Sequence, residues 1–151
     1  MAGELRNFSF IEDGKVAGMA FPNTPLDKLN ELDVELVISL TEHTVPDDLK
    51  GSFKGEFKHV PVPDFQAPTV EQLADCVNAI EAINKKNKAA VVHCQGGMGR
   101  TGTILAAWLV ANKKLPVDEA ITQIRALRPR SVETDEQVES IRKFASSLEN
   151  L

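Results

Sequence analysis

Apolar residues follow one another along the chain in short unbroken runs and in longer stretches with a spacing of three and four. A run of about four to eight apolar residues between turn-forming residues is typical of a buried strand. The first two runs lie on either side of a turn at residues 12–15, which predicts a hairpin. Altogether, the pattern predicts strands at residues 8–11, 16–20, 35–40, 57–62 and 89–92.

The spacing of three and four predicts helices between and after these strands. Thr24 and Pro25 predict the N-cap and the first position of a short helix. Thr69 and Gln72 have the spacing of a capping box ahead of a longer helix. The apolar spacing places Cys76 on the buried side of that helix, so we expect it to be a packing residue.

Helices are also predicted for most of the remaining chain. Apolar residues at helical spacing follow residue 99, and we expect Trp108 among them to lie in the core. Pro116 begins a further helix, with Leu127 on its apolar side. Thr134 and Gln137 predict the cap of a last helix.

Strands alternate with helices early in the chain, and helices dominate its later part. This order is typical of an α/β domain, with a central, mostly parallel sheet of about five strands flanked by helices. We find no linker, repeat or low-complexity tract, so residues 1–151 are predicted to form one domain. In such sheets the ligand site lies at the carboxyl ends of the strands. Cys94, Asp64 and residues 41–43 each follow such an end, so we expect them to lie close together.

Composition narrows the classes of protein and of partner. The net charge of −5 argues against a nucleic-acid-binding protein, which is usually basic. No apolar run approaches the ~20 residues that span a bilayer, and neither end resembles a signal peptide or a prenylation box. The two cysteines make no disulfide framework, and a reactive thiol needs a reducing compartment. We expect a cytosolic monomer that binds neither nucleic acid nor membrane, with passage into the nucleus left open.

Residues 89–104 join a buried strand, a glycine-rich loop and the start of a helix. After His93 and Cys94, the loop reads Gln95, Gly96, Gly97, Met98, Gly99 and Arg100. Glycines let a backbone approach a ligand closely, and successive amides can point into one concavity at a helix N-terminus. The helix dipole also favours negative charge there. The loop is therefore predicted to hold a dianion of the size of phosphate, with Cys94 at its floor.

The residue types at this loop suit nucleophilic catalysis by a thiolate. A helix N-terminus and a neighbouring cation both stabilise a thiolate, and Arg100 supplies the cation near Cys94. The guanidinium also matches two phosphate oxygens in a bidentate way that a lysine cannot. Thr101 can donate its hydroxyl to the sulfur as it leaves. Attack of Cys94 on phosphorus would give a cysteinyl-phosphate, which splits the hydrolysis into two displacements.

The departing oxygen needs a proton, which a carboxylic acid on a neighbouring loop can supply and later recover from water. Asp64 is the candidate, although it could also be a plain turn residue among prolines. His43, His59 and His93 are not spaced as a metal site, and no acidic cluster indicates magnesium. We therefore expect neither a metal nor a cofactor.

The string HCQGGMGRTG, from His93 to Gly102, resembles the signature loop of the cysteine-based protein tyrosine phosphatase superfamily. The chain is also similar to small atypical dual-specificity phosphatases at residues 7–10, 16–18, 39–42, 62–65 and 127–134. This resemblance implies the fold of that family, with Cys94 as nucleophile, Arg100 as phosphate clamp and Asp64 as general acid. It also implies that His93 orients the cysteine and that the amides of residues 95–100 hold the phosphate.

In relatives, a polar residue after the last loop helps to place the hydrolytic water. Glu133 and Gln137 both match that region, and the role stays open between them. Glu133 could instead only place negative charge at the start of the last helix. The separate phosphotyrosine-recognition loop of the longer, tyrosine-specific members has no counterpart here, which implies a shallower pocket open to several phosphoresidues.

The resemblance implies a metal-independent phosphatase of phosphorylated proteins, acting on phosphotyrosine and less readily on phosphoserine and phosphothreonine. One alternative is a phosphatase of phosphoinositides or RNA 5′-ends. Lipid-directed relatives often carry lysines inside the signature loop, whereas the loop positions here are uncharged. The other alternative is a pseudophosphatase that only binds phosphoresidues. Such proteins usually lose the cysteine, the arginine or the acid, and this chain keeps all three.

Overall fold

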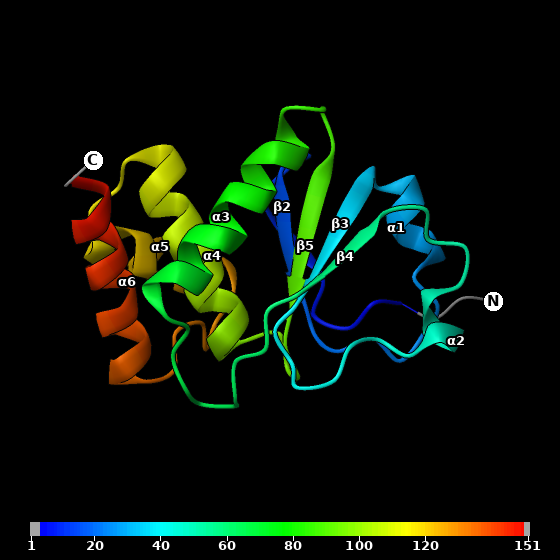
Figure 1. Ribbon diagram of the computed structural model, residues 1–151, viewed down its shortest axis with the longest axis horizontal. Helices are drawn as coiled ribbons and strands as arrows, with labels where there is room; N and C mark the ends of the chain where they lie inside the picture. Colours follow the sequence, from blue (N-terminus) through cyan, green and yellow to red (C-terminus); the bar gives the residue numbers. More distant parts are fainter. Residues whose placement is uncertain (1–3, 150–151) are drawn as a thin grey trace.

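The strands form one sheet through the middle of the molecule (Figure 1). The computed structural model describes residues 4–149 and orders the five strands β1-β2-β5-β3-β4. Their bounds are β1 Ser9–Glu12, β2 Val16–Met19, β3 Val34–Ser39, β4 Glu56–His59 and β5 Ala89–His93. β2, β5, β3 and β4 are parallel to one another, and β1 is antiparallel to β2. The prediction of a mostly parallel sheet of about five strands is confirmed.

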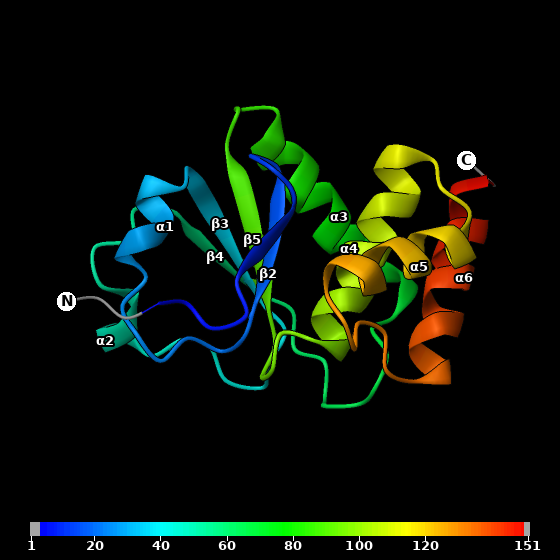
Figure 2. The ribbon, with the colours of Figure 1, turned by 180° about the vertical axis from the view of Figure 1, so that it is seen from behind.

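Helices cover both faces of this sheet (Figures 1 and 2). Two short helices, α1 Asp27–Glu31 and α2 Asp47–Lys50, lie on one side. The opposite side carries α3 Val70–Asn84, α4 Gly99–Lys113, α5 Val117–Leu127 and α6 Asp135–Glu149. Within the described part of the chain, no helix is long and apolar enough to cross a membrane.

Strand β5 is central in the sheet and buried on both faces. Ala90 and Val92 pack into the cluster that includes α3 and α4, whereas Ala89 and Val91 pack into the cluster that includes α1. Because both faces are buried, the strand reads as a continuous apolar run rather than as an alternating one. β5 thus crosses the core and delivers Cys94 at the carboxyl edge of the sheet.

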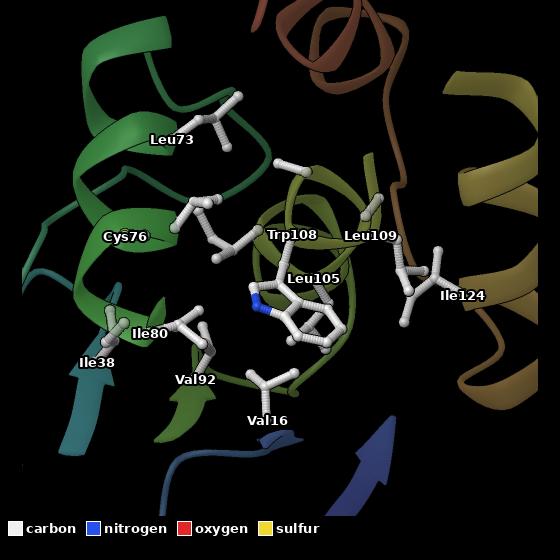
Figure 3. Packing of buried hydrophobic residues seen from close by; sticks show 14 of the residues in the cluster. Val16, Ile38, Leu73, Cys76, Ile80, Val92, Leu105, Trp108, Leu109 and Ile124 are labelled. Carbon is white, nitrogen blue, oxygen red and sulfur yellow. The ribbon is translucent and has the colours of Figure 1, made fainter. Parts of the chain in front are cut away.

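Helix α4, which begins within the glycine-rich loop, is the central helix of the larger layer. All of its residues from 99 to 110 are buried, as expected of a helix surrounded by other elements. Figure 3 shows Trp108 in the same cluster as Val16 and Val92 of the sheet and Ile80 of α3. Trp108 is therefore a core residue, as predicted.

Cys76 lies on the buried side of α3 and is fully buried. Burial raises the pKa of its thiol to about 12, and the Asp75 carboxylate acts in the same direction, while Lys58 opposes it. This thiol stays protonated at physiological pH, so Cys76 packs the core, as its helical spacing predicted.

The predicted capping boxes are confirmed at two helices. At α3, Thr69 Oγ1 accepts from Gln72 N at 3.1 Å, and Gln72 Oε1 accepts from Thr69 N at 2.9 Å. At α6, Gln137 N donates to Thr134 Oγ1 at 3.1 Å, and Thr134 N donates to Gln137 Oε1 at 3.3 Å. These bonds satisfy amides that the first helical turn leaves without partners.

Two local predictions were wrong, and one short helix was not predicted. The N-cap of α1 is Leu26 rather than Thr24, because Leu26 N pairs with Leu49 O and the helix begins after that bond. Helix α2 was not expected, since none of its four residues is buried and it leaves no apolar period. Leu127 is 49% exposed, because the chain turns at the end of α5 and buries Arg128 instead.

Candidate active site

The predicted site residues meet at the carboxyl edge of the sheet, the lower edge in Figure 1. Cys94 directly follows β5, and Asp64 lies on the loop after β4. Pairing continues past the strand ends, because Leu40 N donates to His93 O at 3.0 Å and Val62 N donates to Leu40 O at 2.9 Å. The loops that carry the site therefore begin from a fixed register.

The conformation of the glycine-rich loop turns its amides toward one side. Gly97 has φ +72°, and a Cβ there would lie 2.5 Å from the backbone at the end of β2, so only glycine fits. Asn7 Nδ2 donates to Gly96 O at 3.0 Å, and Arg128 Nη2 donates to Gly97 O at 2.6 Å. In a trans peptide the N–H points opposite to the carbonyl, so the amides of Gly97 and Met98 face away from these anchors.

Cys94 lies at the floor of a hollow of about 160 Å³. Its side chain is 3% exposed, and Thr101 Oγ1 donates to Sγ at 3.0 Å. Helix α4 begins at Gly99, so its N-terminus adjoins the same hollow. The residues that line the hollow are Asp64, Phe65, Cys94, Gln95, Gly96, Met98, Gly99, Arg100 and Glu133. The hydroxyl and the helix N-terminus both favour negative charge on the sulfur.

Arg100 joins the signature loop to the loop that carries Asp64. Its side chain is 5% exposed, and Nη1 donates to Val62 O at 2.9 Å. Nη2 lies 3.4 Å from Asp64 Oδ1, which also accepts from Phe65 N at 2.9 Å. The Asp64 side chain is 57% exposed. The structure thus places Arg100 and Asp64, the predicted clamp and the predicted acid, side by side at the hollow.

His93 is fully buried behind the cysteine. Its Nδ1 lies 3.2 Å from Cys94 O and its Nε2 lies 2.6 Å from Ser39 Oγ. Burial lowers the pKa of His93 to about 4, the bond to Cys94 O opposes this shift, and the electrostatic effects of Arg100 and His59 add to it. The ring is therefore neutral at physiological pH, donates from Nδ1 to the carbonyl and accepts from the Ser39 hydroxyl. This pair fixes the backbone of Cys94.

Of the two polar candidates after the last loop, only Glu133 reaches the hollow. Its carboxylate packs against Gly99, where an added Cβ would collide with Glu133 Oε1. Gln137 is fully buried, its Oε1 accepts from Glu133 N at 2.7 Å, and its Nε2 donates to Gln66 O at 3.1 Å. Gln137 thus ties the last loop to the loop that carries Asp64.

Arg128 is a part of the site that the sequence pattern did not indicate. Its side chain is 3% exposed, and Nη1 donates to Asn7 O at 2.8 Å, Ser9 Oγ at 2.7 Å and Gly18 O at 3.2 Å. Burial lowers the pKa of its guanidinium, and Cys94 opposes this shift. A basic residue before the helix-ending Pro129 is the single local signal, and it does not reveal a buried cation.

Among the other hollows of the described chain, two bear on the site or on the core. One, of about 320 Å³, shares Asp64, Gln95 and Arg100 with the site. A larger one, of about 620 Å³, is lined by Lys15 and Trp108 among others and lies toward the amino ends of β2 and β5. Among residues 4–149, no three His, Cys, Asp or Glu side chains gather as a metal site.

The geometry of strand, cysteine, glycine-rich loop and arginine defines a cysteine-based phosphatase site. The family model described as "Swiss Army Knife protein, DSP-PTPase phosphatase domain" matches residues 5–141. The chain belongs to this family of dual-specificity-type phosphatase domains.

Relatives agree with this assignment. Tyrosine-protein phosphatase CDC14 of Candida albicans is 32% identical over 131 residues, which cover 83% of this chain and 23% of that protein. Phosphatidylglycerophosphate phosphatase PTPMT2 of Arabidopsis thaliana is 30% identical over 149 residues, which cover 96% of this chain and 65% of that protein. The chain thus spans less than two thirds of the length of these curated relatives.

A solved structure matches nearly end to end. The crystal structure of Tk-PTP in the active form is 35% identical in sequence, with a TM-score of 0.80 over 93% of this chain and 97% of that one. The crystal structure of PTPMT1 in complex with PI(5)P has a TM-score of 0.83 at 20% identity, a likeness that concerns the fold alone.

Proposed function

We propose that the protein hydrolyses phosphoric monoesters on proteins, phosphotyrosine first and phosphoserine or phosphothreonine more slowly, through a cysteinyl-phosphate. The observation that carries this proposal is the position of Cys94. Its sulfur lies at the floor of a hollow bounded by a helix N-terminus, 3.0 Å from the Thr101 hydroxyl. Packing alone does not require that arrangement, whereas a thiolate that attacks a bound dianion does.

In the first step, the Cys94 thiolate attacks phosphorus, the S–P bond forms and the bond to the leaving oxygen breaks. The amides of residues 95–100 and the Arg100 guanidinium hold the phosphoryl oxygens and stabilise their charge. Arg100 exchanges its present contact with Asp64 for the phosphate. Asp64 donates its proton to the leaving oxygen, because an alkoxide is too basic to depart without one.

In the second step, water attacks phosphorus and the S–P bond breaks. The Asp64 carboxylate accepts the proton of the water, and Thr101 Oγ1 donates to the departing sulfur. Glu133 lies in the hollow and orients the attacking water, a role that Gln137 does not share. The amide of Gln137 is already bonded to Glu133 N, Thr134 N and Gln66 O.

The rim of the hollow supports a protein substrate that carries one phosphoryl group. Phe65 is 62% exposed at the wall of the hollow, where its ring can meet the ring of a phosphotyrosine. Phe65 has φ +63°, a conformation that costs a bulky residue energy and often occurs at ligand contacts. The loop positions Gln95, Gly96, Gly97, Met98 and Gly99 carry no charge that would meet a second phosphate.

A phospholipid monoester is the second candidate, because the relative that covers 96% of this chain is a phosphatidylglycerophosphate phosphatase. The experiment compares a phosphotyrosine peptide, a phosphoserine peptide, phosphatidylglycerophosphate in vesicles and a 5′-triphosphorylated RNA, each with a metal chelator. We expect the highest kcat/KM on phosphotyrosine, and none of this turnover in Cys94→Ser. Cys76→Ser, which alters the other cysteine, serves as the control and stays active.

Faster hydrolysis of the phospholipid than of the peptides would mean that the substrate is a lipid. Faster hydrolysis of the RNA would mean that it is a nucleic acid. Binding of phosphopeptides without turnover would make the protein a pseudophosphatase. The retained Cys94, Arg100 and Asp64 support turnover instead.

We also propose that the chain is of the type of VHZ, the small atypical dual-specificity phosphatase whose motifs it shares along its length. On this proposal it acts as a monomer on phosphorylated proteins, without nucleic acid or membrane partners. Its free thiol at the site supports a reducing compartment, the cytosol, with passage into the nucleus.

A further inference from the structure

A cleft of about 320 Å³ adjoins the hollow that holds Cys94. It shares Asp64, Gln95 and Arg100 with that hollow, and its remaining lining is Phe21, Thr41, Glu42 and His43. We call these seven residues the side cleft. The two hydrolytic steps use none of the four residues that are unique to it. A substrate whose phosphate lies over Cys94 meets the side cleft next.

The walls of the side cleft are held in place by the site itself. Phe21 N donates to Gln95 O at 2.9 Å, and the Phe21 ring packs edge-on against His93 with centroids 5.4 Å apart. Thr41 Oγ1 donates to His43 O, and His59 Nε2 lies 2.7 Å from Thr41 O. Since these contacts already exist, a ligand does not have to order the cleft on binding.

The side cleft carries negative charge. Its lining has two carboxyl groups, and because Asp64 is protonated when it acts as the acid, Glu42 supplies the negative charge beside the guanidinium of Arg100. Arg100 is bonded to Val62 O and paired with Asp64, and on our mechanism it turns to the phosphate. Glu42 is exposed, and within residues 4–149 its carboxylate has no hydrogen-bond or ion-pair partner. Phe21 lines the same cleft, and an aromatic ring can bind a cation over its face.

We propose that the side cleft binds a lysine or arginine side chain next to the phosphorylated residue of a protein substrate. The Glu42 carboxylate pairs with this cation, and the Phe21 ring contacts its alkyl stem or its charged head. An extended peptide advances roughly 3.3–3.6 Å per residue, so a basic side chain one or two positions away can reach the cleft. The inference rests on the proposed function, because it places the phosphate on a peptide.

The same charge acts against competing substrates. A flanking acidic residue or a second phosphate would lie beside Glu42 and be repelled, since like charges at close range cost free energy. The side cleft thus makes Glu42 a residue that determines substrate specificity, separate from the residues that transfer the phosphate.

The test uses a set of phosphotyrosine peptides. Each peptide carries arginine, glutamine or glutamate at one of the two positions before or the two positions after the phosphotyrosine, and the other positions stay the same. At one or more positions we expect kcat/KM for the arginine peptide to exceed that for the glutamate peptide roughly five- to tenfold, the effect of an exposed ion pair with a cation–π contact. The ratio should shrink in about 0.5 M salt, because salt screens exposed charges.

Variants assign the preference to the side cleft. Glu42→Gln should bring the arginine-to-glutamate ratio within about twofold, and Glu42→Lys should reverse it. Glu71→Gln is the control, because it removes an exposed carboxylate of α3 outside the cleft and should keep the ratio. Equal hydrolysis of all peptides, or an unchanged ratio in Glu42→Lys, overturns this inference and leaves the proposed function standing. If the protein hydrolyses none of the peptides but does hydrolyse the phospholipid, both this inference and the proposed function are overturned.

Discussion

Asp64 and Glu133 bring two carboxylates to the hollow above Cys94 from separate loops. Asp64 stands at the mouth, 3.4 Å from Arg100, whereas Glu133 packs against Gly99 at the start of α4. On the proposed mechanism the leaving group departs toward the mouth, where the peptide chain continues into solvent. We therefore propose Asp64 as the proton donor and Glu133 as the residue that orients the water.

The two roles differ in their dependence on the leaving group. Asp64→Asn should lower kcat/KM on a phosphoserine peptide by about 10²–10⁴-fold, because an alkoxide needs the proton. On p-nitrophenyl phosphate the loss should be much smaller, because nitrophenolate leaves unaided. Glu133→Gln should lower kcat on both substrates to a similar value and change kcat/KM little, since water attacks the same cysteinyl-phosphate after either leaving group has departed. The assignment is reversed if Glu133→Gln shows the leaving-group dependence and Asp64→Asn does not.

His93 makes stability depend on pH. Its pKa is about 4 in the folded protein, against an ordinary value of 6.5. Between pH 4 and pH 6.5, His93 therefore binds a proton in the unfolded chain but not in the folded one. The free energy of unfolding should therefore fall as pH drops from 6.5 to 4, by about 3 kcal/mol from this group.

Urea unfolding of wild type and His93→Asn across that pH range measures this contribution. The variant starts less stable, because it loses the bonds to Ser39 and Cys94 O, but its pH slope should be shallower. His43→Asn alters an exposed histidine and should keep the wild-type slope. An unchanged slope in His93→Asn would mean that His93 is not held neutral.

At the scale of elements, the β1–β2 hairpin, the signature loop and the end of α5 converge on Arg128. Its guanidinium bonds to Ser9 of β1, Gly18 of β2 and Gly97 of the loop. A Cβ at Gly18 would lie 2.9 Å from Arg128 Cζ, so glycine in β2 makes room for the guanidinium. These contacts hold the carbonyl of Gly97 outward, and the loop amides therefore face the phosphate site.

Removal of this side chain should cost both stability and activity. Arg128→Leu removes the guanidinium donor from Asn7 O, Gly18 O and Gly97 O, so we expect the free energy of unfolding to fall by roughly 2–5 kcal/mol. Because the loop loses an anchor, kcat/KM should fall in the molecules that remain folded. Arg142→Leu is the matched control, since Arg142 forms an exposed ion pair with Asp118 and should cost at most about 1 kcal/mol. Equal costs for both variants would contradict the anchoring role.

At the scale of the whole molecule, the elements and the loop that holds the candidate nucleophile followed from local patterns. Apolar runs marked the strands, capping boxes marked α3 and α6, and three glycines after Cys94 marked the loop. These features depend on residues close together in the chain, so a sequence reveals them. The helical spacing failed at Leu127, because a period does not tell where the neighbouring surface ends.

The rest of the site depends on contacts between distant residues. Arg128 meets Asn7 across 121 positions, and Gln137 meets Gln66 across 71 positions. Neither pairing leaves a local pattern, so the sequence could not separate Glu133 from Gln137. The side cleft around Glu42 is likewise assembled from four segments that only the fold brings together.

The measurement that tests the central claim most directly is the detection of a phosphoryl group on Cys94. The protein is mixed with a phosphotyrosine peptide without metal, quenched with acid during turnover, digested and analysed by mass spectrometry. We predict one phosphoryl group on the peptide that contains Cys94, absent from Cys94→Ser, and accumulating further in Glu133→Gln. Turnover without any phosphorylated Cys94, or full turnover by Cys94→Ser, would contradict the account.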